Sequence, residues 1–484
     1  MREKIRTFRD DRMRLGKKIK RVCFFCARLS LSLKKTGCGS AESNCENFVF
    51  ICLCARLSLS LKKTGCGSAK KSNEFVFLRS PFTIFEKKRS RPAAARILEA
   101  MMNPLLKTLF AALMLGCGAC GVPSDEPVST LLFAPGDGGS KYYRIPALVT
   151  ADDGSLVAVA DRRLESMGDL PNKIDIVMRR STDGGRTWSP ASPIVEHRGE
   201  CGYGDAALVS DARTGELLCI FASGRGMWDT TPETPIDINV CRSGDFGRTW
   251  SEPERVTPQL WGSACPNPVT KGWYGAFAAS GRALQLRDGT LLFVVAARTG
   301  EAFPPLANYV CMSEDGGRHW TLLPTPADMN GDEAKLVERA DGSWLMSIRN
   351  PAKGRRKYAV SADRGATWSE PRRWEDMPSP ACNGDIVRYT LRTDGFERDR
   401  MLHSIPLDSA ERRNVSVLLS YDEGLTWPVR RTVWSGDAGY SSLTVLPDGD
   451  IGLLTEVGNW ERGFEIYFTR LTPEWLTEGA DSYR

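Results

Sequence analysis

The eight-residue stretch STDGGRTW at 181–188 recurs in this chain as the pattern S-x-D-x-G-x-T/H-W. The four other copies are SGDFGRTW (243–250), SEDGGRHW (313–320), SADRGATW (361–368) and SYDEGLTW (420–427). In such a segment Asp accepts hydrogen bonds from nearby backbone amides, Gly supplies a positive φ, and Trp buries a large ring. We therefore predict five structural turns, each pinned by its Trp to the sheet below, whose Asp residues do no chemistry.

A second pattern alternates with these turns. A Gly-containing tight turn leads a short apolar run in DGSLVAVA (153–160), TGELLCIFA (214–222), DGTLLFVVAA (288–297), DGSWLMSI (341–348) and DGDIGLLTE (448–456). Such a run predicts a hairpin and a buried strand. DRMLHSI (399–405) fills the same position before the fifth Trp turn, which makes six modules. The repeat predicts an all-β fold, a six-bladed β-propeller over residues 121–484.

Charge is distributed unevenly along the 484 residues. Residues 1–107 contain 25 Lys and Arg against 8 Asp and Glu, whereas the remainder contains 40 against 51. The net charge of +6 therefore comes from the N-terminal segment, and the acidic body argues against nucleic-acid binding. The three histidines are scattered without the spacing of a zinc site, so metal-hydrolase chemistry is not expected.

The N-terminal segment carries an exact duplication. CARLSLSLKKTGCGSA occurs at 26–41 and again at 54–69. A folded repeat array needs three or more copies, so we interpret residues 1–100 as a non-native or disordered basic extension. A basic interaction tail is the alternative.

Residues 101–120 have the layout of a signal peptide, with a Lys, an apolar run and then small residues. Leu-Gly-Cys at 115–117 resembles a bacterial lipoprotein cleavage site, which would lipidate Cys117 and attach the protein to a membrane; ordinary cleavage near Cys120 is the alternative. We predict export, to the periplasm, to the outer membrane as a lipoprotein, or to the medium.

The exported body contains six cysteines, whose state the sequence leaves open. They either pair in one of fifteen ways or stay as buried free thiols. The six are Cys201, Cys219, Cys241, Cys265, Cys311 and Cys382.

YRIPAL at 143–148, ahead of the repeated Trp turns, makes the sequence similar to the bacterial exo-α-sialidases, or neuraminidases. The resemblance extends over about residues 130–470. It implies a six-bladed propeller that removes terminal sialic acid from glycoproteins, glycolipids or oligosaccharides. It implies no cofactor and no metal.

The resemblance also implies three arginines that bind the carboxylate of sialic acid. Arg suits this task because its planar guanidinium forms two parallel hydrogen bonds, which Lys does not. Arg144 lies in YRIPAL, Arg349 lies 16 residues after Glu333, and Arg412 lies eight residues before the fifth Trp turn. Arg413 is the alternative to Arg412, because a strand turns only one of two neighbours into a site.

Asp169 is the general acid that the resemblance implies. It lies in a Gly- and Pro-flanked loop six residues after Arg163, where a carboxylate is able to reach the leaving-group oxygen. Asp175 is the alternative, which we interpret as structural because it lies in a predicted strand. Arg163 and Asp205 match positions that line the pocket on the O4 side of the sugar, although Asp205 is equally suited to a turn.

Tyr440, between two Gly-containing turns, matches the nucleophile of the family, with Glu333 as its base. A neutral phenol avoids the repulsion that a carboxylate nucleophile would meet at an anomeric carbon bearing a carboxylate. Glu338 is the alternative base, and Glu456 is a candidate support for one of the arginines. The implied reaction retains configuration through a tyrosyl intermediate.

Two other classes of function stay open. The first is a non-catalytic propeller that binds glycans or proteins. The second is a glycosidase for neutral polysaccharide, which would need paired carboxylates and no arginine triad.

Overall fold

The computed structural model describes residues 126–302 and 304–484. The predicted extension 1–100, the predicted leader 101–120 and Cys117 lie outside these residues. Within the described part, no helix is long and apolar enough to cross a membrane. All six body cysteines are free thiols, and five of them are buried, which decides between the two possibilities left by the sequence.

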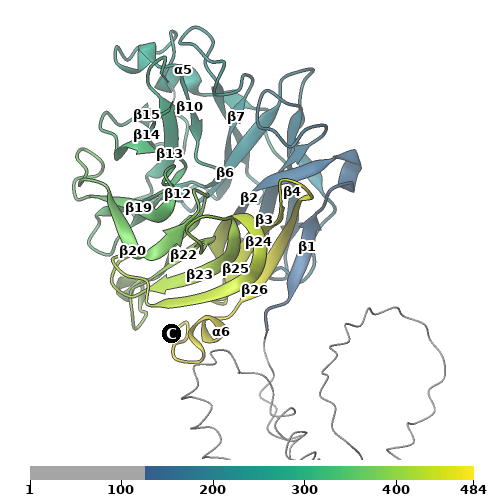
Figure 1. Cartoon of the computed structure of the whole chain (residues 1–484), viewed down its shortest axis with the longest axis vertical. Coiled ribbons are helices and arrows are strands. Elements are labelled where there is room, and N and C mark those ends of the chain that lie inside the picture. Colours follow the sequence, from purple (N-terminus) through teal and green to yellow (C-terminus); the bar gives the residue numbers. More distant parts are fainter. Residues whose placement is uncertain (1–125, 303) are drawn as a thin grey trace, which may run out of the picture. The chain divides into compact units, whose positions relative to one another are not determined.

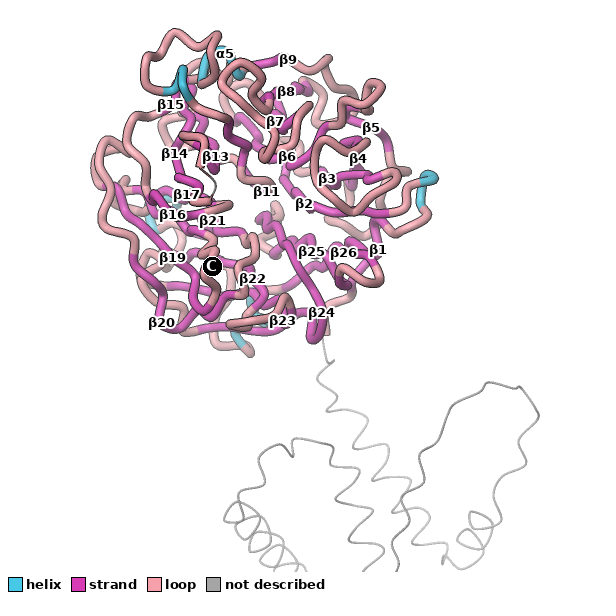
Figure 2. The backbone as a smooth tube through the Cα atoms, turned by 45° about the horizontal axis from the view of Figure 1, so that its top comes forward, coloured by secondary structure: helices cyan, strands magenta, loops and turns pink. Residues whose placement is uncertain are grey.

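The described residues form five sheets of mostly antiparallel strands, arranged in a ring (Figures 1 and 2). The first is β2 (Tyr142–Thr150), β3 (Leu156–Arg163), β4 (Ile174–Ser181) and β5 (Ser192–Val195). The second is β11 (Gly281–Arg282), β6 (Tyr203–Asp211), β7 (Glu216–Ser223), β8 (Asp237–Ser243) and β9 (Glu254–Arg255). The third contains β10 (Gly275–Ala278), β12 (Leu284–Gln285), β13 (Leu291–Arg298), β14 (Leu306–Ser313), β15 (Thr321–Leu322) and β16 (Asp328–Gly331).

The last two sheets complete the ring. The fourth is β17 (Ala334–Glu338), β18 (Trp344–Ile348), β19 (Gly354–Ser361) and β20 (Arg372–Ser379). The fifth has seven strands in the order β1 (Ser129–Phe133), β26 (Gly463–Leu471), β25 (Ile451–Asn459), β24 (Val429–Val445), β23 (Arg413–Ser420), β22 (Arg400–Pro406) and β21 (Asp385–Thr390). Helices are short: α5 (Thr257–Leu260), α6 (Pro473–Thr477) and the 3₁₀ turns η1 (Asp137–Gly139), η2 (Thr270–Gly272) and η3 (Arg392–Asp394).

The ring closes through the two ends of the described chain. β1 pairs antiparallel with β26, from Ser129 opposite Thr469 onward, so the first strand completes the last sheet (Figure 1). The six predicted apolar runs form the strands β3, β7, β13, β18, β22 and β25, which confirms them as buried strands. The architecture is an all-β fold of the β-propeller type.

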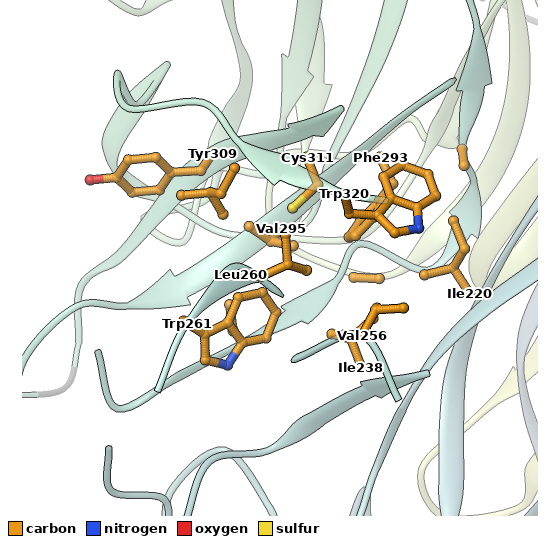
Figure 3. Close-up of a cluster of buried hydrophobic side chains, with 14 of the residues drawn as sticks. Ile220, Ile238, Val256, Leu260, Trp261, Phe293, Val295, Tyr309, Cys311 and Trp320 are labelled. Carbon is orange, nitrogen blue, oxygen red and sulfur yellow. The ribbon is translucent and has the colours of Figure 1, made fainter. Parts of the chain in front are cut away.

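The core lies between successive sheets. In the cluster of Figure 3, Ile220 and Ile238 from the second sheet pack against Phe293, Val295 and Cys311 from the third. Comparable clusters join the other neighbouring sheets. Because each sheet buries apolar side chains on both faces, no sheet is stable without its neighbours.

The five repeated segments make one and the same turn. In each, the Ser hydroxyl donates to the Asp carboxylate at 2.8–2.9 Å, and the backbone amide of the Thr or His donates to the same carboxylate at 2.8–2.9 Å. The Thr187 hydroxyl and amide are the main reason that the pKa of Asp183 falls to about 2. These Asp side chains are therefore committed to their own turns.

The Trp rings of these turns correct one prediction. Trp320 and Trp427 are buried, but Trp188, Trp250 and Trp368 are only partly buried. Trp188 donates from its indole nitrogen to Gly185 of its own turn at 3.0 Å and packs edge-on against Phe468 of the preceding sheet around the ring. The expectation that every Trp ring is buried against the sheet below is wrong for these three; for Trp188 the reason is that its indole nitrogen stays bonded to its own turn.

The turn glycine fits closely against the preceding sheet. A Cβ at Gly185, where φ is +86°, would overlap the Phe468 ring, whereas one at Gly215, where φ is +71°, would meet no atom within 4 Å. We expect Gly215→Ala to lower the free energy of unfolding by about 1–2 kcal/mol through backbone strain alone. Gly185→Ala should cost about 1–3 kcal/mol more through overpacking. Urea unfolding of both variants measures the difference, and equal losses would contradict the packing role.

Candidate active site

Three inner strands, β2, β6 and β24, are irregular at positions that carry predicted site residues. Each contains a β-bulge, and a bulge redirects side chains out of the regular alternation. Ile145 and Asp205 have φ of 58° and 60° at these points, a conformation that β-branched Ile rarely adopts. The register shifts fall between Arg144 and Ala147, between Gly204 and Ala207, and between Ala438 and Ser441.

The remaining predicted residues lie at one end of the sheets, Arg163 as the last residue of β3 and the others in loops. Asp169 follows the second strand of its sheet, β3, and Arg349 and Arg412 follow β18 and β22, which are also second strands. Glu333 immediately precedes the inner strand β17. Because antiparallel strands alternate in direction, the five Trp turns, which follow third strands, lie at the opposite end. The structure thus separates the repeated turns from the site.

Arg144 is held by Glu456, which the sequence analysis named as a candidate support for one of the arginines. Its Nε and Nη2 donate to the two oxygens of Glu456 at 2.9 and 3.0 Å, and both side chains are buried. The backbone amides of Ile145 and Tyr440 donate to the same carboxylate at 2.7 and 3.1 Å. Glu456 therefore fixes the arginine and two segments of backbone at once.

Tyr440 lies among the three predicted arginines. Its hydroxyl donates to Glu333 Oε2 at 2.7 Å and accepts from Arg349 Nη1 at 2.9 Å, while Arg349 also donates to Glu333 at 2.6 Å. The guanidinium carbons of Arg144 and Arg412 lie 5.0 and 5.3 Å from the centre of the Tyr440 ring. A phenol, a carboxylate and three guanidinium groups thus share one site.

Arg412 and Arg413 point in different directions. Arg412 donates to the Ala381 carbonyl at 3.3 Å and faces the Tyr440 ring. Arg413 pairs with Asp408 at 2.7 Å, and 52% of its side-chain surface is exposed. Of the two alternatives that the sequence left open, the structure brings Arg412 to the site.

Arg163 connects the predicted acid to a buried carboxylate. It is fully buried, and its Nη2 lies 3.0 Å from Asp161 and 2.8 Å from Asp169, whose side chain is 67% exposed. The backbone amide of Asp205 donates to Asp161 at 3.2 Å. Burial raises the pKa of Asp161 to about 6 and also raises that of Asp205, with the neighbouring carboxylates adding to the effect.

Ionisation in the Tyr440 couple follows from burial and charge. Burial, and then the Glu333 carboxylate, raise the pKa of Tyr440 well above its usual value, although the three arginines oppose this. Burial also disfavours ionised Glu333, but Arg349, Lys335 and the Tyr440 hydroxyl outweigh it and lower the pKa of Glu333. In the free protein Tyr440 is a neutral phenol bonded to an ionised carboxylate, the arrangement of a nucleophile with its base.

The two competing carboxylates are engaged elsewhere. Asp175 is buried against Arg162 and His197, and Glu338 pairs with Arg287. Among the described residues, no three His, Cys, Asp or Glu side chains are grouped to hold a metal ion.

Several site residues were missed by sequence reasoning. Asp161 stands two positions before Arg163 and Lys335 two positions after Glu333, so strand alternation would have placed each on the same face as its partner. Trp460, whose ring centre lies 4.6 Å from the Arg144 guanidinium carbon, has no comparable local signal.

Comparison with known proteins agrees with this fold. Residues 154–453 match the BNR repeat-like domain family, so the chain belongs to the class of β-propellers with BNR repeats. A sialidase of Micromonospora viridifaciens is 34% identical over 380 residues, which cover 74% of this chain and 56% of that protein. A sialidase of Bacteroides fragilis (strain YCH46) is 29% identical over 344 residues, which cover 66% and 61%. Within this class, the chain is similar to the sialidases.

A solved structure supports the same relationship. The Hadza microbial sialidase Hz136 is 29% identical, with a TM-score of 0.63 over 71% of this chain and 68% of that one. The chain spans less than two thirds of the length of the two curated relatives.

Proposed function

We propose that the protein is an exo-α-sialidase that hydrolyses terminal sialic acid from glycoproteins, glycolipids or oligosaccharides. One observation carries the proposal: the Tyr440 hydroxyl is bonded to both Glu333 and Arg349 beside two further arginines. Three guanidinium groups suit a sugar that bears a carboxylate, and a phenol–carboxylate couple suits attack on its anomeric carbon. A neutral polysaccharide would give the three arginines no partner.

In the first half of the reaction, Arg144, Arg349 and Arg412 hold the substrate carboxylate. Tyr440 Oη attacks the anomeric carbon while its proton passes to Glu333 Oε2, 2.7 Å away. The bond from the anomeric carbon to the leaving oxygen breaks, and Asp169 gives that oxygen a proton. The products of this half-reaction are a covalent adduct, in which the tyrosine oxygen is bonded to the anomeric carbon of sialic acid as an aryl ketoside, and a free aglycone.

In the second half, water replaces the aglycone. Asp169, now ionised, takes a proton from the water as the water oxygen bonds to the anomeric carbon, and the bond to Tyr440 breaks. Glu333 returns its proton to the tyrosine oxygen. Two inversions at the same carbon give net retention of configuration.

The pair of Arg163 and Asp169 gives the acid its resting position. In the free protein Asp169 is bonded to Arg163 and largely exposed. To serve as an acid it must reach the leaving-group oxygen, which it cannot do while it points to Arg163. We therefore propose that substrate draws the loop of Asp169 inward and away from Arg163. Arg163 stays paired with Asp161 when Asp169 leaves.

We further propose that the ring contains six blades, as the sequence predicts. Residues 429–437 of β24 pair with β23, whereas residues 438–445 pair with β25. The seven-stranded sheet is then two blades joined by one long strand, and a separate core cluster of Val387, Leu402, Leu443 and Leu453 packs them together.

Export through residues 101–120, with lipid on Cys117, also stays a prediction.

The proposed function is tested by incubating the full chain with a fluorogenic sialoside and with a sialyllactose. We expect release of the fluorophore and of free sialic acid, and no action on the matching neutral glycosides. Absence of release from either sialoside would overturn the proposal. Binding of a sialylated glycan without turnover would instead support a non-catalytic propeller.

Arg412 and Arg413 offer a matched pair of variants. Arg412→Ala should lower kcat/KM, because a charge-assisted hydrogen bond to the substrate is removed. The fall should correspond to a loss of about 1.5–3 kcal/mol in transition-state stabilisation. Arg413→Ala should change it little, since Arg413 faces solvent and pairs with Asp408. Steady-state kinetics of the two variants decide the assignment, and the reverse order of effects would exchange their roles.

A further inference from the structure

A buried lysine lies behind the carboxylate that we propose as the base. Lys335 is on β17, two residues after Glu333, so strand alternation directs both side chains to the same face. Both are almost fully buried, with 1% and 2% of their surface exposed. Among the described residues, the Lys335 ammonium makes no ion pair within 4.0 Å, an unusual state for a buried cation.

A chain of hydrogen bonds links this lysine to the base. Lys335 Nζ donates to Asn383 Oδ1 at 2.9 Å, and Asn383 Nδ2 donates to the Ser280 hydroxyl at 3.2 Å. The Ser280 hydroxyl donates in turn to Glu333 Oε1 at 3.3 Å. All four side chains are buried. The two oxygens of Glu333 are thus divided: Oε2 serves Tyr440 and Arg349, and Oε1 ends the chain that starts at Lys335.

The charges around this chain come from several elements. The groups that face Glu333 are Arg349, Lys335, Tyr440, Asp332, Asp205, Arg356 and Cys382. The groups that face Lys335 are Glu333, Asp385, Arg356, Arg282 and His403. Asp385 is paired with Arg282 at 3.4 Å, and burial lowers the pKa of His403 well below its usual value. Arg349 and Lys335 are the two main cations that favour ionised Glu333.

We infer that Lys335 is a positioning residue for the sialidase reaction, which keeps Glu333 ionised and oriented toward Tyr440 through Asn383 and Ser280. The inference rests on the proposed function. Arg349 has a second task, since it is also proposed to bind the substrate carboxylate. The negative charge of that carboxylate offsets the effect of Arg349 in keeping Glu333 ionised. Lys335 faces no substrate group in this scheme, so its charge stays available to the base throughout the reaction.

The sign of the expected pH effect follows from the charges. Burial lowers the pKa of Lys335 to about 8, so the side chain is protonated in the acidic range where Glu333 titrates. Removing this cation makes ionised Glu333 less favourable and raises the pKa of Glu333. A base must be ionised to act, so the acidic limb of the kcat/KM profile moves to higher pH.

The test compares Lys335→Met with wild type, using the full chain and a fluorogenic sialoside between pH 3.5 and 8. We expect the acidic limb of the kcat/KM profile to move about one pH unit higher and kcat at the optimum to fall roughly tenfold. KM should stay nearly unchanged, because the three arginines that bind the substrate remain. Lys357→Met is the control, since Lys357 is a partly buried lysine on β19 that pairs with Asp328 and donates to the Asn330 carbonyl, outside the chain of bonds that ends at Glu333, and its profile should not move.

Two outcomes separate the inference from the proposed function. If wild type releases no sialic acid, both fail; if wild type is active and the acidic limb of Lys335→Met coincides with it, only this inference fails. Should Lys335→Met not fold, Ser280→Ala takes its place, because it removes the bond to Glu333 and keeps every charge. That variant should lower kcat and leave KM unchanged, and an unchanged kcat would overturn the inference.

Discussion

Replacing Tyr440 with phenylalanine should remove most turnover and leave the fold intact. The ring keeps its contacts with Ile145 and Cys382, and Arg144 and Arg412 keep their positions beside it. Arg349 loses its bond to the hydroxyl but stays paired with Asp332 and Glu333. Only the attacking oxygen is lost, so Glu333 has no hydroxyl to deprotonate. We expect turnover to fall by a factor on the order of 10²–10⁴. Affinity for a sialic acid analogue, measured by calorimetry, should change little.

The configuration of the product provides a sharper test of the same variant. Any remaining turnover must use water on the face that Tyr440 occupied, activated by Glu333. A single displacement by that water gives inverted sialic acid, whereas the wild type gives retained product. Proton NMR of the first product, before mutarotation, distinguishes the two. Wild-type turnover with retention in Tyr440→Phe would show that another group is the nucleophile.

Replacing Asp169 with asparagine should make the rate depend strongly on the leaving group. Natural sialosides need a proton on the departing oxygen, so their turnover should fall on the order of 10²–10⁴-fold. An aryl sialoside with an acidic phenol departs without that proton and should lose far less. The loop side chain is exposed and pairs with Arg163, so stability should change little.

Glu165→Gln is the matched control for Asp169→Asn. Glu165 lies in the same loop, is similarly exposed at 68%, and pairs with Lys173. Its replacement should leave both substrates unaffected. Equal losses on natural and aryl sialosides in Asp169→Asn would remove Asp169 from the role of acid.

The sequence by itself determined the local features of this protein. Ser, Asp, Gly and Trp of each repeated turn lie within eight residues, and the turn is closed by hydrogen bonds that span four residues or fewer. The buried strands follow from apolar runs after tight turns. The sequence pattern of both features is local, although their stability also depends on neighbouring sheets, and for this reason the all-β fold was predictable from the pattern alone.

Only the tertiary structure decided how charges are paired in the site. Arg144 meets Glu456 across 312 residues, and Tyr440 meets Glu333 across 107. Arg412 rather than Arg413 faces Tyr440, and the link from Lys335 to Glu333 passes through Asn383 and Ser280 on other segments. The physical reason is burial: a charge removed from water needs partners within hydrogen-bond reach, and in a ring of sheets those partners come from different sheets. The position of a residue in the chain says little about which sheet will supply them.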